Sequence, residues 1–422
     1  MREMKDSGVE WIGTIPTNWK LNKIGTLYDE RSTKVNDSEY PPLSVTKQGI
    51  VPQLETAAKT DNGDNRKLIK KNDFVINSRS DRRGSCGISE YEGSCSLINT
   101  VLRPRKNMCN TYYGYVFRSE RFADEFYRWG NGIVDDLWST KWSNMKRIYI
   151  PSPTLDEQKC IADYLDEKCS KIDAIIEKQQ TVIEKLKAYK LSVITEAVTK
   201  GLNPDVKMKD SGIKWVDSIP SKWENRKMLS ILSMRVVDGP HESPELFDEG
   251  IPYISATAVV NGKIDFSLMR GYISSEYCDE CDKRYKPKQG DILVIKLGAS
   301  TGKVAMVETN DRFNIWVPLA AVRCNEEAFP RFVYYAFQSD YFLRQMELSW
   351  TFGTQQTLGV KTIEQLRILV PPISEQGEIS TYLDIKCSAI DNVIAHKEAI
   401  IEKLTSYKKS LIYEVVTGKK EI

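Results

Sequence analysis

The sequence lacks several features that would define a class of protein. No apolar run approaches the roughly 18 residues of a membrane-spanning helix, which excludes such a span. There are only two His residues, and the lone Cys-x-x-Cys at Cys278 and Cys281 has no matching pair, so we expect no metal site. The nine Cys are scattered behind an opening without an apolar signal core. We therefore expect reduced thiols and a cytoplasmic protein.

Catalytic motifs are also missing. The sequence has no GxSxG, no HExxH and no Gly-rich dinucleotide fingerprint. It also has no Asn/Asp-Pro-Pro-Tyr/Phe tetrapeptide of the kind that amino-methyltransferases use, because the two Pro-Pro pairs are followed by Leu43 and Ile373. We expect no catalytic residue and no cofactor bound by this chain. The net charge of +2 does not by itself indicate a polyanion partner.

The chain contains a long internal repeat. When the sequence is shifted by 218 residues, residues 157–199 align with 375–417, and 23 of 43 positions are identical. Neither Pro nor Gly interrupts the first copy, which predicts one long helix.

The apolar residues of both copies follow a heptad, which predicts a coiled-coil seam. One line comprises Ile161, Ile175, Val182 and Tyr189, with Ile379, Val393, Ile400 and Tyr407 in the second copy; the other comprises Leu165, Ile172, Leu186 and Val193, with Leu383, Ile390, Leu404 and Leu411. Polar residues interrupt both copies at equivalent places, Lys168 and Lys386 on the first line and Gln179 and Lys397 on the second. Polar seam residues fix the register of a pair, so we expect the two helices to pair with each other. The first helix leads from the first domain to the second and the second helix leaves the second domain, so we expect the pair to be antiparallel.

A second repeat opens each half. Residues 4–20 return at 208–224 with nine of 17 positions identical. Pro16 and Pro220 exclude a helix there, and the repeated Trp residues are typical of anchors that dock an irregular segment on an apolar surface. Base stacking is the alternative role for these Trp residues.

Two dissimilar segments, 21–150 and 225–368, lie between the repeats. Each combines short apolar strands, at 73–77 and 291–295, with an amphipathic helix, near 112–129 and 331–348. The expected fold is mixed α+β, with two α/β domains separated by an antiparallel two-helix coiled coil and related by an internal pseudo-twofold repeat. The expected boundaries are 1–150 and 202–370 for the domains, and 151–201 and 371–422 for the helices. Each helix would be a rigid spacer of roughly 65 Å.

The polar turn of the first domain, within residues 70–87, is a candidate DNA contact. Arg79, Arg82 and Arg83 lie beside Ser85 and two Gly residues, after a predicted strand. Arg matches the geometry of phosphates and guanine edges, and Gly permits close approach of the backbone. The alternative is a solvated turn.

The second domain has a related turn within residues 288–305. Its candidates are Lys296, Ser300, Thr301 and Lys303. The turn is similar to a P-loop but has three residues between its Gly residues instead of four, and Val304 where Ser or Thr is required, so nucleotide hydrolysis is excluded. A strand followed by a Gly/Ser/Lys turn is a good candidate for a contact with the phosphate backbone.

Weaker candidates lie on other turns. His241 ends the turn that begins at Asp238. Lys141 lies in the segment 135–142, and Gln355 and Gln356 lie in the segment 353–357; both segments are predicted turns near the ends of the domains. Gln can read adenine and Lys can read guanine. Structural or solvated roles are the alternative for each.

The order and duplication of these segments resemble the specificity subunits of type I restriction-modification enzymes. The resemblance covers essentially the whole chain and rests on the duplicated opening MKDSGxxWxxxIPxxW and on the passage from Pro151 and Pro371 through Glu-Gln to Tyr-Leu-Asp and Glu-Lys-Leu. Each of the two dissimilar segments also contains a strand and turn like those of the family. In the second segment it runs from Gly290 to Lys303, and in the first a more divergent version runs from Asn72 to Gly87.

The resemblance implies a DNA-binding subunit with two target recognition domains, each reading one half of a split, asymmetric sequence, and with the helices as a ruler. It implies double-stranded DNA, two methyltransferase subunits and two restriction subunits as partners. S-adenosylmethionine, ATP and Mg²⁺ would belong to those partners. For Glu157, Gln158 and Leu165, and for Glu375, Gln376 and Leu383, it implies a structural or docking role.

Two other functions are compatible with parts of the sequence. One is a coiled-coil adaptor whose globular ends bind proteins without reading DNA. The other is a nuclease, but the sequence offers no clustered carboxylates with the spacing that metal-dependent cleavage requires.

Overall fold

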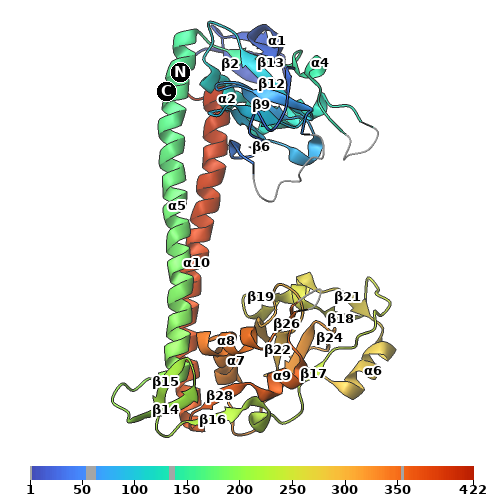
Figure 1. The fold of residues 1–422 in the computed structure, drawn as a ribbon, viewed down its shortest axis with the longest axis vertical. Coiled ribbons are helices and arrows are strands. Elements are labelled where there is room, and N and C mark those ends of the chain that lie inside the picture. Colours follow the sequence, from blue (N-terminus) through green and yellow to red (C-terminus); the bar gives the residue numbers. More distant parts are fainter. Residues whose placement is uncertain (1, 54–62, 133–137, 353–355) are drawn as a thin grey trace. The chain divides into compact units, whose positions relative to one another are not determined.

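The computed structural model describes residues 2–53, 63–132, 138–352 and 356–422. The chain divides into two compact units, one formed by Met1–Gln180 with Glu398–Ile422 and the other by Thr181–Lys397. Each unit contains one α/β domain and one end of each of two long helices, α5 (Leu155–Lys200) and α10 (Ile373–Val416), drawn in green and in red in Figure 1.

Helix α5 begins at a capping box, in which a hydroxyl and a carboxylate satisfy each other's backbone N–H groups. The Thr154 hydroxyl accepts from the Glu157 N–H at 3.3 Å, and a Glu157 carboxylate oxygen accepts from the Thr154 N–H at 3.2 Å. The helix ends before Gly201, whose positive φ of 74° suits a residue without a side chain. Residues that flank the first copy of the repeat therefore define both ends of α5.

The two long helices pair in the first unit through the start of α5 and the end of α10. Leu165 and Ile172 belong to the same buried cluster as Leu411 and Val415. Beside this cluster, the Lys408 ammonium donates to both carboxylate oxygens of Asp173, at 2.7 and 2.6 Å.

In the second unit the end of α5 pairs with the start of α10. Val193 and Ala197 share a buried cluster with Ile379 and Leu383. Lys190 donates to both oxygens of Asp391, at 2.7 Å each. The pairing is antiparallel in both units, because early residues of one helix meet late residues of the other.

The predicted seam needs one correction. Five residues of the first predicted line are between 36% and 57% exposed, namely Ile175, Val182, Tyr189, Val393 and Tyr407, while Ile400 is half-buried. The buried line lies one residue later, at Ala162, Cys169, Ile183 and Cys387. Ile161 and Ile379 are buried because the cores of the two domains cover them.

The second predicted line lies at the seam. Leu165, Ile172, Val193, Leu383, Ile390 and Leu411 are buried, and Leu186 and Leu404 are half-buried. This line and the corrected line are spaced by three and four residues, as the two lines of a coiled-coil seam are.

The first domain is built on an antiparallel four-stranded sheet, in the order β10-β9-β12-β4. Its strands are β4 (Tyr28–Glu30), β9 (Phe74–Asn77), β10 (Cys86–Ile88) and β12 (Asn99–Pro104). Strand β9 is buried along its whole length, as its apolar sequence predicts, and α2 (Asn110–Arg118) packs against the sheet. Smaller elements are α1 (Ile24–Leu27), β5 (Lys34–Val35), β6 (Leu43–Thr46), β7 (Gly49–Pro52), β8 (Arg66–Ile69), β11 (Gly93–Cys95) and α4 (Trp142–Met145).

The second domain repeats this plan with different residues. Its four-stranded sheet has the order β17-β25-β22-β23. The strands are β17 (Val237–Asp238), β22 (Ile292–Ile295), β23 (Val304–Met306) and β25 (Leu319–Val322). A three-stranded sheet of β18 (Ile251–Ile254), β21 (Gly271–Ile273) and β24 (Asn314–Ile315) adjoins helix α6 (Ser275–Arg284). The second domain also contains two strand pairs and a short helix. The pairs are β19 (Val259–Val260) with β20 (Lys263–Ile264) and β26 (Thr351–Phe352) with β27 (Gln356–Thr357), and the helix is α9 (Val360–Gln365).

Each opening segment is a β-hairpin followed by a strand, not the irregular segment that was expected. β1 (Met4–Asp6) pairs with β2 (Thr14–Pro16), and β14 (Met208–Ile213) pairs with β15 (Val216–Pro220). The Asp6 carboxylate accepts from the N–H of Gly8, which has a positive φ, and this local bond forms the turn. The next strands, β3 (Lys20–Lys23) and β16 (Glu224–Lys227), pair with β13 (Tyr149–Ser152) and β28 (Arg367–Val370) at the ends of their domains.

The amphipathic helix expected in each domain is two helices. In the first domain α2 is followed by α3 (Glu120–Arg128), and in the second α7 (Pro330–Gln338) is followed by α8 (Asp340–Leu348). Ser119 and Ser339, both in extended conformation, separate them. Each Ser hydroxyl bonds a carbonyl three residues earlier, at 2.7 and 2.6 Å, which stabilises the break.

The last residues of the chain lie on the first hairpin. The Tyr413 hydroxyl donates to the carbonyls of Trp11 and Ile12, at 3.2 and 3.1 Å. A Cβ added to Gly418 would lie 2.5 Å from Pro16, so only Gly permits this contact. Gly201 lies against Pro220 and Trp223 of the second hairpin in the same way.

Candidate nucleic-acid interface

In the first domain the polar turn after β9 lies against a segment that comes about 60 residues later. The Ser80 N–H donates to the Trp138 carbonyl at 3.1 Å, and the Thr140 N–H donates to the Ser78 carbonyl at 2.9 Å. The exposed residues of the turn, Arg79, Arg82 and Arg83, are thereby brought beside exposed Lys141. Residues 135–137, which belong to the predicted segment before Lys141, lie outside the described residues.

Not all candidates in this turn are accessible. Ser85 is buried, and its N–H donates to the Arg82 carbonyl at 3.0 Å, so it shapes the turn. Arg83 pairs with Asp124 of α3, and Arg82 lies 3.5 Å from Asp81. These exposed pairs are weak, so both guanidinium groups can exchange a carboxylate for a phosphate.

The second domain holds its turn in the same way. The Gly298 N–H donates to the Gln356 carbonyl at 3.0 Å, and the Leu358 N–H donates to the Lys296 carbonyl at 2.8 Å. Half-buried Ser300, exposed Lys303 and half-buried Gln356 are therefore on neighbouring segments. Gln355 lies outside the described residues.

Lys296 and Thr301 require a correction as candidate contacts. The Thr301 side chain is buried, and its hydroxyl donates to the Gly298 carbonyl at 2.7 Å, which closes the turn. Lys296 is 7% exposed as a residue, and its ammonium lies 2.8 Å from a carboxylate oxygen of Asp238. Lys296 is thus the buried partner of a carboxylate and is not free to contact a phosphate.

Asp238 is the centre of a charge cluster in the second domain. Burial raises the pKa of Asp238, but the hydrogen bond and charge of Lys296, together with Arg284 and His241, outweigh burial and lower this pKa overall. The exposed imidazole of His241 lies 3.3 Å from Asp238. The cluster fixes the turn that carries His241 beside the turn at Gly298.

Two Gln residues position the short helices, and their role was predicted only as structural or docking. Gln158 is buried, accepts from the Cys109 N–H at 2.9 Å and donates to the Pro153 carbonyl at 2.9 Å. Gln376 accepts from the Phe329 N–H at 2.8 Å and donates to the Pro371 carbonyl at 2.8 Å. Cys109 and Phe329 are the N-cap residues of α2 and α7, whose backbone N–H groups need a partner.

The repeated Trp residues anchor the opening segments on the same helix ends. Trp19 and Trp223 are fully buried, and their indole N–H groups donate to Glu157 at 3.4 Å and to Glu375 at 3.1 Å. The repeated Glu-Gln dipeptide thus fastens a hairpin with its first residue and a short helix with its second.

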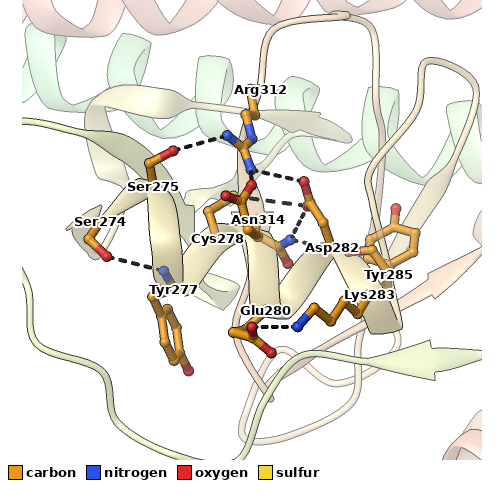
Figure 2. Close-up of polar contacts among 11 residues, drawn as sticks. Ser274, Ser275, Tyr277, Cys278, Glu280, Asp282, Lys283, Tyr285, Arg312 and Asn314 are labelled. Carbon is orange, nitrogen blue, oxygen red and sulfur yellow. Dashed lines mark hydrogen bonds and ion pairs between the residues drawn. The ribbon is translucent and has the colours of Figure 1, made fainter.

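The Cys-x-x-Cys segment lies in α6, where both thiols are free and buried. Burial raises the pKa of Cys278 to about 11. Figure 2 shows that Arg312 reaches the polar side of this helix, where it pairs with Asp282 at 3.1 Å and with Asp279. The Asn314 amide also donates to Asp282, at 2.9 Å. The carboxylates of Asp279 and Asp282 therefore attach α6 to β24 and to Arg312 just before it.

The part of the chain that the structure describes has neither a metal-binding cluster nor a helix suited to a membrane. No group of three His, Cys, Asp or Glu side chains is arranged to hold a metal ion in these residues. No helix within them is long and apolar enough to cross a membrane.

Comparison with known protein families identifies the chain. The model of the type I restriction modification DNA specificity domain matches residues 18–185 and again residues 220–406, which together are most of the sequence. The chain belongs to the family of type I restriction-modification specificity subunits. It is the DNA specificity subunit of such a system, the subunit that is itself non-catalytic.

Individual relatives agree with this assignment. The putative MjaX specificity subunit of Methanocaldococcus jannaschii is 24% identical, over 97% of this chain and 95% of that protein. The EcoKI specificity subunit of Escherichia coli is 23% identical, over 83% and 75%. The HsdS subunit of Thermoanaerobacter tengcongensis has the same fold, with a TM-score of 0.50 and 14% identity over 98% of this chain and all of that one. A chain solved in a study of complex assembly and conformational transition of the type I R-M system gives a TM-score of 0.70, with 13% identity over 96% and 99%.

Proposed function

We propose that the chain reads a bipartite, asymmetric DNA target, with one recognition domain for each half and the paired helices as the ruler for the unspecified spacer. The proposed recognition segments are residues 21–150 and 225–368, within domains 1–150 and 202–370. The observation that carries the proposal is that one repeated frame supports two dissimilar domains. The ion pair of Asp173 with Lys408 is repeated at the equivalent positions by Asp391 with Lys190, as expected for an isologous pair of helices.

The proposed DNA contacts are the exposed polar residues of the turns. They are Arg79, Arg82, Arg83 and Lys141 in the first domain, and His241, Ser300, Lys303 and Gln356 in the second. In each domain two segments distant in sequence are hydrogen-bonded at the end of a buried strand, β9 or β22, which gives a rigid base for these side chains. Arg and Lys there can bind phosphates or guanine, and Gln356 can bind adenine.

The exposed apolar residues of the helices are the proposed docking surface for the methyltransferase subunits. In the first unit Ile175 and Tyr407 are exposed, and in the second Tyr189 and Val393 are. They occupy the heptad position that flanks the seam, and in an antiparallel pair this position of both helices lies on the same side. A stripe of this kind is suited to an additional helix from a partner.

The repeated frame supports two equivalent docking surfaces and hence two methyltransferase subunits, with two restriction subunits completing the complex in the cytoplasm. S-adenosylmethionine, ATP and Mg²⁺ would be bound by those partners. The relatives are described as subunits of type I restriction enzymes, which supports this assembly.

The test is to express the chain with its methyltransferase subunit in a methylation-deficient host and to map modified bases across the genome. We expect a split motif, two short specific blocks around a fixed gap, with adenine methylated on both strands. Exchange of residues 21–150 for the corresponding segment of another specificity subunit should change one block and leave the other. A change in both blocks, or in neither, would contradict the modular proposal.

A further inference from the structure

The first domain contains a small cavity next to its basic turn. The cavity lies between the turn at 78–84 and helix α3, and its apolar walls include Phe117, Ala123 and Phe126. Its volume is about 10 Å³. One water molecule needs roughly 10–15 Å³ on this scale, so the space suits a single group of about that size.

Two uncharged polar side chains in the wall of the cavity are already hydrogen-bonded within the protein. The Thr140 hydroxyl donates to the Phe126 carbonyl at 2.7 Å, and the Asn77 side-chain oxygen accepts from the Arg79 N–H at 3.0 Å. A buried water needs two to four polar partners to be stable. The cavity therefore favours an apolar group over a water molecule.

Charged and aromatic side chains surround the entrance. Arg79 and Arg83 are exposed and also line the cavity. Tyr127 lines it as well, with its ring 5.9 Å from that of Trp138. A ligand that places an apolar group in this cavity therefore also lies beside two guanidinium groups, one of which, that of Arg83, pairs with Asp124.

At the equivalent place in the second domain, the described residues that correspond to the cavity wall differ. Helices α3 and α8 are both nine residues long and follow an equivalent Ser, so Leu343 takes the position of Ala123 and Met346 that of Phe126. Met346 is buried, and its methyl carbon would lie 3.4 Å from a Cβ on Gly302 of the turn. Leu343 packs against the core of the domain. The small side chain of Ala123 is thus replaced by a larger one, Leu343, at the equivalent position of the second domain.

We propose that this cavity receives the C5 methyl group of a thymine in the half-target read by the first domain. The inference rests on the proposed function and adds to it the base that this part of the domain recognises. The thymine methyl is the apolar group that a base pair presents in the major groove, where Arg side chains also read guanine or hold phosphates. Ala123, which leaves the space open, is then a specificity-determining residue.

The test uses the full-length chain assembled with its methyltransferase subunit, and a duplex with the target found by methylation mapping. Each thymine of the half-target assigned to the first domain is replaced, one at a time, by deoxyuridine, which lacks only the methyl group. Binding is measured by fluorescence anisotropy. We expect one replacement to weaken binding roughly fourfold, the value for about one buried methyl group. Deoxyuridine in the other half-target should have no such effect.

Two variants of the chain separate the cavity from other causes. Ala123→Leu copies the residue of the second domain and fills the space, so it should bind the thymine and deoxyuridine duplexes equally, at the affinity of the deoxyuridine duplex. Ala123→Ser keeps the side chain small and should retain the difference. Unchanged binding of the deoxyuridine duplex by Ala123→Leu shows that the domain is folded.

Several outcomes would overturn the inference. They are a first half-target without thymine, no deoxyuridine effect at any position, equal effects in both half-targets, or a persistent difference in Ala123→Leu. Failure of the proposed function looks different, because the wild-type complex would then bind the mapped target no better than a scrambled duplex.

Discussion

The Lys408 ammonium lies within 2.7 Å of both carboxylate oxygens of Asp173, so the end of α10 is joined to the start of α5 by a two-point contact. Both residues have a counterpart in the repeat, and the counterparts, Lys190 and Asp391, pair with each other in the same way. Each ion pair therefore sets the register of the helices in its own unit.

Charge reversal should test this contact. Asp173→Lys places two ammonium groups together, and we expect a loss of about 0.5–1 kcal/mol in the free energy of unfolding, since the pair is partly exposed. The double variant Asp173→Lys with Lys408→Asp should recover most of the lost free energy of unfolding, because the charges are again opposite. Urea unfolding of the two single variants and the double variant measures the coupling. Purely additive effects would show that the contact does not stabilise the pair.

Removal of the buried amide of Gln158 should be more costly. Gln158→Leu leaves the Cys109 N–H and the Pro153 carbonyl unpaired, and we expect a loss of about 1–3 kcal/mol in the free energy of unfolding. Gln48→Leu, on the surface of the same domain, is the matched control and should be nearly neutral. The base sequence of the methylated target should not change, because Gln158 positions α2 and does not contact DNA. An altered target would assign it a direct role in reading.

The buried pair of Lys296 and Asp238 should make the second domain acid-sensitive. The pKa of Asp238 is lowered in the folded state, so its contribution to stability is complete above the ordinary carboxyl pKa of about 4 and is lost as the pH falls through the lowered value. Asp238→Asn leaves the Lys296 charge unpaired, and at pH 7 we expect a loss of about 3–5 kcal/mol. The difference in the free energy of unfolding between wild type and variant, measured by urea unfolding, should become smaller below pH 4. A difference that is independent of pH would exclude the ion pair as its cause.

The exposed stripe on the helices should matter for assembly and not for folding. Tyr189→Asp and Tyr407→Asp introduce charge at exposed positions, so the free energy of unfolding should change by less than about 0.5 kcal/mol. Binding of the methyltransferase subunit, measured by co-purification and calorimetry, should be lost or strongly weakened.

Seam and turn variants are the controls for the stripe. Leu165→Asp, which buries a charge at the seam, should destabilise the chain itself. Arg82→Ala should leave assembly intact and weaken DNA binding. Normal assembly by both Tyr variants would place the docking surface elsewhere.

The sequence predicted the frame better than its details. Two long helices and their pairing follow from the repeat, because identical landmarks require identical packing. The register of one seam line was wrong by one residue, because hydropathy favours Ile175, Val182 and Tyr189 over the true line. The true line contains Cys169, whose small side chain permits close approach of the helices, and Lys190, which donates a hydrogen bond to Asp391.

The candidate interface was predictable in part. Arg79, Arg82 and Arg83 stood out by residue type and turn context and are exposed. The pairing of Lys296 with Asp238 was not predictable, because 58 positions separate them along the chain and only the pairing of β17, β25 and β22 in one sheet brings them together. The cavity at Ala123 likewise depends on how α3 meets the turn, which no local pattern encodes.

The contacts at Gly418 and Gly201 have a topological consequence. After α5, the chain runs from Gly201 directly into the hairpin that this Gly touches, whereas after α10, Gly418 touches a hairpin from the opposite end of the chain. The same contact between the Gly after a long helix and a hairpin thus forms with and without a direct peptide link. Noncovalent contacts are therefore sufficient to hold hairpin and helix together. We therefore expect that a rearranged gene, which joined residue 422 to residue 1 and opened the chain before the second hairpin, would preserve the contacts of both Gly residues with the two halves in the opposite order.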